Sequence, residues 1–183
     1  MNPLYKKALS LTELIIAIVL LGTVFAAATA FNLATYKFYY SADKYAQTQL
    51  AIAPAMELIS KNILQGIGAK DDPAVSFTGA GPPYNNITIR YDSTGNAQID
   101  ANDKKVEFKL QGNIIKFDPD ITNAGDEQEI ATRVVNLSFT PDSDYFLIDV
   151  KITARFVPTQ IAGSDNPEVT LETSVSQRLA SIN

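Results

Sequence analysis

The sequence predicts an α+β fold in which one long N-terminal helix packs on an antiparallel β-sheet. Two observations carry this prediction. An uncharged, apolar run over residues 14–31 is continued by a helical pattern of apolar residues. From about residue 70 the pattern changes to alternation of apolar and polar residues, which is typical of strands with one buried and one exposed face.

The apolar run is long enough to cross a membrane. Residues 9–31 would measure roughly 34 Å as a helix, against about 30 Å for the hydrocarbon core of a bilayer. Lys6 and Lys7 precede the run, so the positive-inside rule places the N-terminus in the cytoplasm and the rest of the chain outside it. The aromatic residues that follow suit either a membrane–water interface or packing on the globular part: Tyr36, Phe38, Tyr39, Tyr40 and Tyr45.

The helical pattern continues beyond the predicted membrane span as an apolar stripe. Its members are Tyr45, Ile52, Met56, Ile59 and Ile63. Pro54 predicts a kink or a short break near the middle of this stretch. Gly66 and Gly68 predict the end of the helix, which we expect to run from Leu9 to Gln65. The stripe is available to cover the sheet, which needs a partner for its apolar face.

Alternation of apolar and polar residues predicts five strands. They cover residues 87–91, 106–110, 135–139, 148–156 and 169–175. Turn segments rich in Gly, Pro, Asn and Asp separate them, for example at residues 79–83 and 111–113. A run of such strands joined by short turns indicates an antiparallel sheet.

Composition excludes several kinds of catalytic centre. The chain has no Cys and no His, which rules out disulfides, Cys-based metal sites and Ser-His-Asp or Cys-His catalysis. Two acidic segments, 118–120 and 126–129, are predicted to be solvated loops. No glycine-rich phosphate loop or nucleophile motif is present. We therefore predict that the protein is not an enzyme. Without residues 1–8 the chain has 13 basic and 20 acidic residues, a balance of −7, which disfavours a nucleic-acid partner.

One loop has a weak resemblance to a calcium site. Within residues 92–103, oxygen-bearing side chains stand at spacings like those of an EF-hand loop, among them Asp92, Asn96, Asp100 and Asp103. The loop lacks the usual glycine, and strand patterns flank it where helices would be expected. A polar hairpin loop is the alternative, and we expect no cofactor and no other metal.

The N-terminal motif carries the functional prediction. It reads Lys6-Lys7-Ala8-Leu9-Ser10-Leu11-Thr12-Glu13-Leu14 and leads directly into the apolar run. A carboxylate such as that of Glu13 costs about 2.5–3.5 kcal/mol inside a membrane helix, so it needs a compensating partner. The motif resembles the prepilin signature of bacterial type IV pilins and type II secretion pseudopilins. It departs from the commoner pattern in having Ala8 where Gly usually stands and Leu9 where Phe usually stands.

The resemblance implies a processing step and an assembly role. A prepilin peptidase would cut between Ala8 and Leu9, and the new N-terminus at Leu9 would be N-methylated. Glu13 would pair with the N-terminal amine of a neighbouring subunit. The chain would then divide into a leader (1–8), a transmembrane assembly helix (9–31), a soluble helix (32–68) and a sheet domain (69–183).

The same resemblance implies a minor subunit. A mature length of 175 residues is long for a major pilin, and Ala30 stands where major pilins commonly have Pro. The body is similar to the J-class pseudopilins and W-class minor pilins. Expected partners are other pilin or pseudopilin subunits, the prepilin peptidase and an inner-membrane assembly platform. The expected location is a single pass through the inner membrane with the body in the periplasm, followed by a pilus or pseudopilus.

Three alternatives stay open at the level of sequence. The chain could be a membrane-anchored periplasmic binding domain that never polymerises, with Glu13 inert at the interface. It could carry an ordinary secretory signal peptide, since Ala28-Thr29-Ala30 matches a cleavage site. It could also be an exported enzyme on the same body, which the missing motifs argue against.

Overall fold

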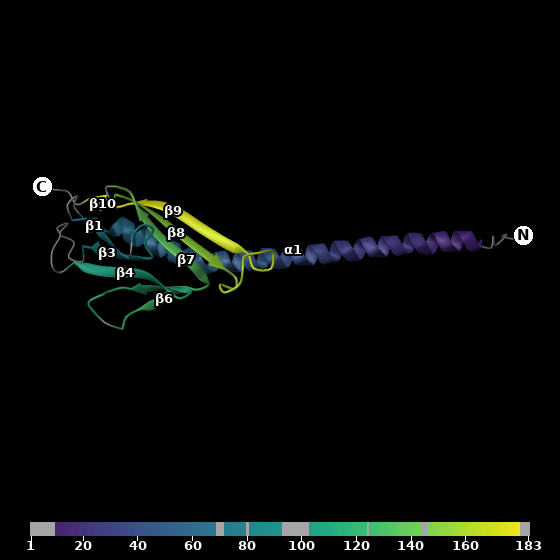
Figure 1. The fold of residues 1–183 in the computed structure, drawn as a ribbon, viewed down its shortest axis with the longest axis horizontal. Helices are drawn as coiled ribbons and strands as arrows, with labels where there is room; N and C mark the ends of the chain where they lie inside the picture. The colour runs from purple at the N-terminus through teal and green to yellow at the C-terminus, as the bar shows by residue number, and fades with distance from the viewer. Residues whose placement is uncertain are drawn as a thin grey trace, which may run out of the picture. The chain divides into compact units, whose positions relative to one another are not determined.

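The computed structural model describes residues 10–68, 72–79, 81–92, 103–123, 125–143 and 146–179 (Figure 1). Over these residues the chain forms one long helix followed by strands. The elements are α1 (Leu11–Gln65), β1 (Ile67–Gly68), β2 (Val75–Thr78), β3 (Asn86–Tyr91), β4 (Lys104–Gln111), β5 (Ile114–Asp118), β6 (Gln128–Ala131), β7 (Val134–Pro141), β8 (Leu147–Arg155), β9 (Glu168–Ser176) and β10 (Arg178–Leu179).

The chain divides into two compact units, Met1–Ala42 and Asp43–Asn183. The first unit holds the N-terminal part of α1. The second unit, which we call the body, holds the C-terminal part of α1 and all the described strands, which gather around the helix in Figure 1. A long helix packed on antiparallel sheets confirms the predicted α+β fold.

The described strands of the body form three sheets. The largest has five strands in the order β2-β3-β4-β5-β6, each antiparallel to the next in sequence. The second has three antiparallel strands in the order β7-β8-β9. The third is a short parallel pair, in which Ile67 of β1 lies opposite Arg178 of β10. Backbone hydrogen bonds of 2.9 and 2.8 Å between Tyr84 and Phe139 link the two larger sheets.

The apolar stripe of α1 forms the centre of a single core. The buried residues of the helix are Thr48, Ile52, Ala55, Ile59 and Ile63. The four apolar ones belong to one cluster with side chains from both larger sheets, including Ile87, Ile89, Phe108, Ile115, Leu137, Phe139, Ile148, Val150 and Ile152. The helix is therefore the shared cover of both sheets.

The predicted burial of the stripe is confirmed at its three isoleucines and is wrong at its first residue. Tyr45 is exposed, because burial of the helix begins only at Thr48. Met56 lies at the margin and is partly buried. Thr48 can be buried because its hydroxyl donates a 2.8 Å hydrogen bond to the carbonyl of Lys44, so no polar group is left unsatisfied. Thr48 was not predicted as part of the stripe because its side chain is polar.

Pro54 lies inside α1 without interrupting it. Proline removes the hydrogen bond to the carbonyl of Leu50, but both residues are exposed, so water can bond to that carbonyl instead. The predicted short break is therefore absent, and only a bend within a continuous helix is compatible with the structure. The helix ends at Gln65 as predicted, where the Gly66 amide donates to the carbonyls of Asn62 and Ile63.

The five predicted strands correspond to β3, β4, β7, β8 and β9, whereas β1, β2, β5, β6 and β10 were not predicted. β2 and β6 have only four residues each, which is too short for a clear alternation. Within β7 the register shifts between Val134 and Asn136, so Val134 is buried and Val135, the predicted core residue, is only half-buried. The apolar residues also divide between two sheets, where one was expected.

Candidate functional site

The first turn of α1 is closed by a reciprocal pair of hydrogen bonds. The backbone N–H of Ser10 donates to Oε2 of Glu13 at 2.8 Å, and the backbone N–H of Glu13 donates to Oγ of Ser10 at 3.2 Å. This arrangement is a capping box, in which a Ser and a Glu three residues apart satisfy amides that the helix leaves unbonded. Glu13 is thus held in a defined position at the beginning of the helix.

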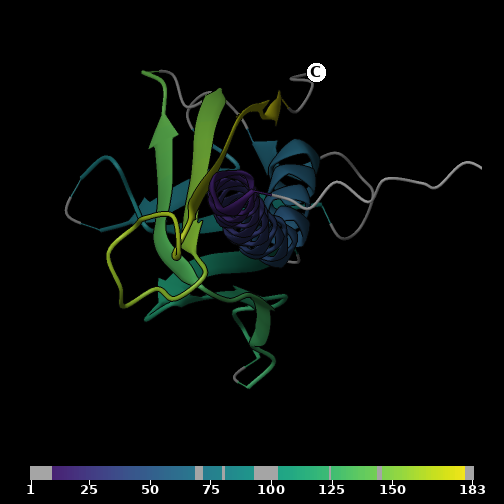
Figure 2. The same cartoon turned by 90° about the vertical axis from the view of Figure 1, so that its right-hand side faces the viewer.

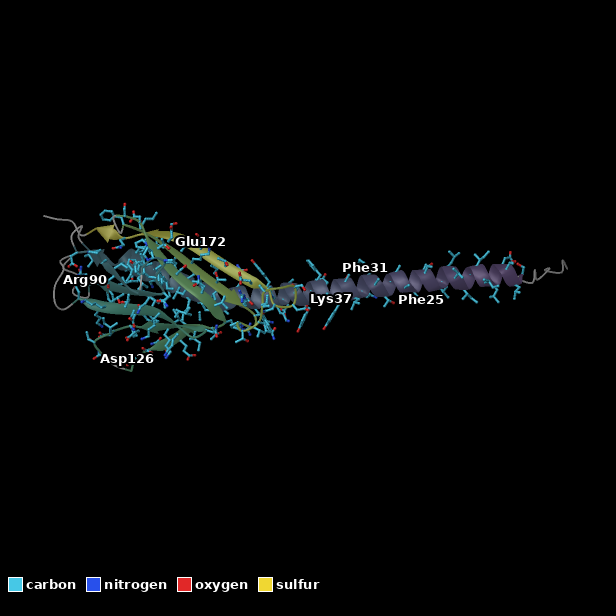
Figure 3. All side chains as sticks on the ribbon, viewed as in Figure 1. Phe25, Phe31, Lys37, Arg90, Asp126 and Glu172 are labelled. Carbon is cyan, nitrogen blue, oxygen red and sulfur yellow. The ribbon has the colours of Figure 1, made fainter. Side chains whose placement is uncertain are left out.

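The stretch of chain that follows Glu13 is uncharged. From Leu14 to Tyr36 no residue carries a charge. The large apolar side chains of this stretch are exposed on all sides of the helix, and Phe25 and Phe31 stand out from it in Figure 3. The hydroxyls of Thr23 and Thr29 each donate 2.8 Å hydrogen bonds to helix carbonyls, of Leu20 and Phe25 respectively. These two hydroxyls are satisfied within the helix, as a lipid environment demands.

By length and composition α1 can cross a membrane. This property is compatible with a single-pass membrane anchor near the N-terminus of the chain. Glu13 would stand at one end of that anchor, and Lys37 is the first charged residue after the uncharged stretch.

An aromatic segment follows the uncharged stretch. Tyr36 and Tyr40 stack with ring centroids 6.1 Å apart, and Phe38 meets Tyr39 edge-on at 6.0 Å. All four rings are exposed, as is Tyr45. Exposed Tyr side chains next to an apolar helix suit the boundary between lipid and water.

The predicted processing site lies outside the described residues. Ala8 and Leu9 are not among the described residues, so the cleavage between them and the methylation of Leu9 stay predictions. Glu13 is described, and its hydrogen-bond partner Ser10, three residues before it, was not predicted. The Ser-x-x-Glu spacing is itself a recognised capping signal and could have revealed the pair.

The calcium candidates are only partly visible in the structure. Asp92 and Asp103 are described at the two ends of the loop, and Asn96 and Asp100 lie outside the described residues. Among the described residues no group of three acidic side chains comes together that could hold a metal ion. Nothing in the described part of the loop therefore supports a calcium site.

The acidic segment at 126–129 is only partly a solvated loop. Glu127 accepts a hydrogen bond from the ammonium group of Lys109 and forms a 3.1 Å ion pair with Lys116, and Lys109 also pairs with Glu107 at 3.1 Å. These side chains come from β4, β5 and the segment before β6. The Lys109 hydrogen bond holds the pKa of Glu127 below its ordinary value of 4.5, and the same bond raises the pKa of Lys109 above 10.5. The network fastens β6 to the rest of the five-stranded sheet.

One hollow lies on the five-stranded sheet and has a volume of about 350 Å³. Arg90 lies in it and forms an ion pair with Asp72 at 2.9 Å, and Lys105 lies nearby. Ser76 and Thr88 contribute hydroxyls. Asp72 is the carboxylate among these lining residues, and Arg90 pairs with it. The hollow therefore offers polar and charged contacts.

Comparison with protein-family models, with curated proteins and with solved structures returned no match. Two features define the candidate site: a carboxylate fixed in the first helical turn, and an uncharged helix exposed on every side.

Proposed function

We propose that the chain is a minor pilin or pseudopilin, a structural subunit that is trimmed near its N-terminus and built into a pilus or a pseudopilus. The single observation that carries the proposal is Glu13, one carboxylate at the start of a stretch that is uncharged from Leu14 to Tyr36. Cleavage between Ala8 and Leu9 would create an amine four residues before this carboxylate.

The physical argument is one of charge compensation. A carboxylate and an ammonium group in lipid are each costly alone, and pairing removes most of that cost. Glu13 accepts a hydrogen bond through one oxygen, Oε2, from Ser10 of its own helix. A carboxylate has acceptor sites on both oxygens, so Oε1 is able to accept a hydrogen bond from the amine of a neighbouring copy. Such pairing fixes the axial offset between adjacent helices.

The N-terminus of the protein extracted from the membrane tests the proposal. We expect sequencing and mass measurement to find a chain that begins at N-methylated Leu9. Ala8→Glu is the matched control, because a charged side chain at the scissile bond should leave the precursor uncut. A wild-type chain that begins at Met1 would contradict the proposal, and one that begins at Phe31 would indicate a signal peptide.

The role of the Glu13 charge in assembly can be separated from the role of Glu13 in capping the helix. Glu13→Gln keeps an oxygen that can accept the Ser10 N–H, so it preserves the capping box but removes the charge. Glu13→Ala removes both. In a deletion strain we expect both variants to be cleaved and folded but not assembled into filaments. Normal assembly of the Gln variant would show that the charge of Glu13 is dispensable.

A second candidate function is a membrane-anchored periplasmic binding domain. One observation favours it: both described hydrogen bonds of Glu13 are made with Ser10 of its own chain and need no neighbouring copy. On this alternative the uncut chain, beginning at Met1, stays in the membrane and never enters a filament. The N-terminal measurement described above distinguishes the two candidates.

A further inference from the structure

The outer face of the five-stranded sheet carries two pairs of cationic side chains that lie directly opposite each other. In the register of β3 with β4, which are neighbouring teal strands in Figures 1 and 2, Arg90 lies opposite Lys105. In the register of β4 with β5, Lys109 lies opposite Lys116. All four positions alternate with the buried residues of their strands. Like charges at directly opposite positions repel each other, so each pair gains from an anion placed between its members.

The chain supplies the anion for one of these pairs. Oε1 of Glu127 accepts a hydrogen bond from the ammonium group of Lys109, and Oε2 forms a 3.1 Å ion pair with Lys116. A single carboxylate thus contacts both cations, one through each oxygen. The folded chain itself shows which group fits between two opposed cations on this face.

The other pair is compensated only in part. Asp72 forms a 2.9 Å ion pair with Arg90, whose side chain is 14% exposed, and the Asp72 carbonyl accepts a second hydrogen bond from it at 3.1 Å. Nε of Arg90 is buried and has no hydrogen-bond partner among the described residues. No acidic side chain that the structure describes forms an ion pair with Lys105. Glu107, two residues further along the same face, pairs with Lys109 at 3.1 Å.

The hollow of about 350 Å³ lies at this partly compensated pair. Arg90, labelled in Figure 3, and Lys105 both line it, together with Asp72. Ser76 and Thr88, which lie opposite each other in the register of β2 with β3, add two hydroxyls. Guanidinium, ammonium and hydroxyl groups all donate hydrogen bonds, and a carboxylate accepts them through both oxygens. The hollow therefore collects donors around one uncompensated positive charge.

We propose that this hollow binds a carboxylate group from outside the chain, held between Arg90 and Lys105 as Glu127 is held between Lys109 and Lys116. The carboxylate belongs to an acidic side chain of a polypeptide or to a free organic acid, which present the same chemistry. Its single negative charge matches the one positive charge that Asp72 leaves uncompensated. A phosphate monoester, with a charge of about −1.5 to −2 at pH 7, exceeds it. The inference goes beyond the proposed function and does not depend on filament assembly.

The Nε–H signals of the arginines allow a direct test, because the chain has only four arginines. The ¹⁵N-labelled full chain in nonionic detergent micelles would be titrated at constant ionic strength with acetyl-Ala-Asp-Ala-amide, succinate or inorganic phosphate. The neutral peptide acetyl-Ala-Asn-Ala-amide is the control ligand, and Arg90→Lys identifies the Arg90 signal. Arg155 is the internal control, because its Nε already donates a 2.6 Å hydrogen bond to Glu168. We expect a saturable shift of the Arg90 signal with a carboxylate ligand and little change at Arg155.

Two variants of neighbouring lysines complete the test. Lys105→Gln should raise the dissociation constant by about fivefold, because it removes one of the two cations. Lys104→Gln is the matched control, since Lys104 has the same charge on the same strand but lies opposite Tyr91 and does not line the hollow. It should change the constant by less than about twofold.

The relative affinities of the ligands identify the source of the carboxylate. Tighter binding of the acidic peptide than of succinate would identify a polypeptide, and the reverse order a free acid. The proposal is overturned if neither carboxylate shifts the Arg90 signal, or if Arg90 and Arg155 respond equally, which would show a general effect of ions. Tighter binding of phosphate than of both carboxylates, or equal losses in the two lysine variants, would overturn it as well.

Discussion

Helix α1 has two parts with opposite surfaces. In the unit Met1–Ala42, apolar side chains such as Ile18, Val24 and Phe25 are exposed in every direction. In the body, only one face is apolar and buried, while Glu57 and Lys61 on the other face are exposed. The secondary structure is the same over both parts. The difference lies in the partner each surface suits, which is lipid for the first part and protein for the second.

Substitutions in the two parts of α1 should therefore affect different properties of the protein. Residues 43–65 of the helix are explained by packing, so substitutions there should change the free energy of unfolding. Residues 11–42 make no contribution to the buried core, so substitutions there should act on membrane insertion and assembly.

The body should fold without the first unit but not without its helix. A fragment of residues 43–183 retains the whole buried stripe, so we expect native-like circular dichroism and dispersed amide NMR signals. A fragment of residues 69–183 loses Ile52, Ile59 and Ile63, which exposes the apolar faces of both sheets. We expect this shorter fragment to be unfolded or aggregated. A well-folded 69–183 fragment would show that the helix is not a necessary cover.

Ile59→Asp should be the most damaging single substitution in the stripe. Ile59 is fully buried, and the substitution removes its packing and buries an unpaired charge. We expect the free energy of unfolding of the 43–183 fragment to fall by on the order of 5 kcal/mol in urea titrations. Leu50→Asp is the control on the opposite face, where the side chain is 72% exposed, and should cost less than about 1 kcal/mol. Equal losses in the two variants would contradict the one-sided packing.

Gly68→Ala should destabilise the junction between the helix and the sheets. A Cβ atom at Gly68 would overlap the backbone nitrogen of Ala74 and would lie 2.8 Å from the carbonyl carbon of Pro73. Backbone atoms cannot move aside as a side chain can, so we expect a loss of about 2 kcal/mol in the same urea titrations. Gly163→Ala is the control, since a Cβ there has no atom within 4 Å, and its effect should be within about 0.5 kcal/mol or slightly stabilising.

Acidification should weaken the body in part through Glu127, and this is the smallest expected effect. Because the Lys109 hydrogen bond lowers the pKa of Glu127 in the folded state, the unfolded state binds its proton more readily. The contribution is complete above the ordinary pKa of 4.5 and is lost as the pH falls through the lowered value. Melting temperatures measured from pH 7 to pH 3 should therefore decline less steeply for Glu127→Gln than for the wild type. Parallel declines would show that the ion pairs are screened by solvent.

Elements with a strong periodicity of apolar residues could be predicted from the sequence. Features that depend on the pairing of neighbouring strands could not. Ile52, Ile59 and Ile63 were recognisable as a buried face because large apolar residues recur at helical spacing. Thr48 was missed because its burial depends on a hydrogen bond to a carbonyl, which composition does not reveal. The shift at Val134 was missed because the bulge arises from the pairing of β7 with β8.

The candidate site shows the same division between local and distant information. Glu13 was identified from the sequence because a carboxylate next to an uncharged stretch is unusual whatever the fold. Its capping partner, Ser10, could also have been predicted from the sequence, because the two residues are only three positions apart. The ion pairs of Glu127 with Lys109 and Lys116 were not, because they require the register of β4, β5 and β6 to bring residues 11 and 18 positions apart together.

The pairing of β1 with β10 has a consequence for the order in which the body can be completed. These strands join residues 67–68, directly after the helix, to residues 178–179 near the C-terminus. Because a chain is synthesised from its N-terminus, the stripe of α1 exists before β9 and β10 do. During that interval the core lacks Val169 and Val175, which β9 contributes to it. Closure of β1 on β10 is therefore a late event in the completion of the body.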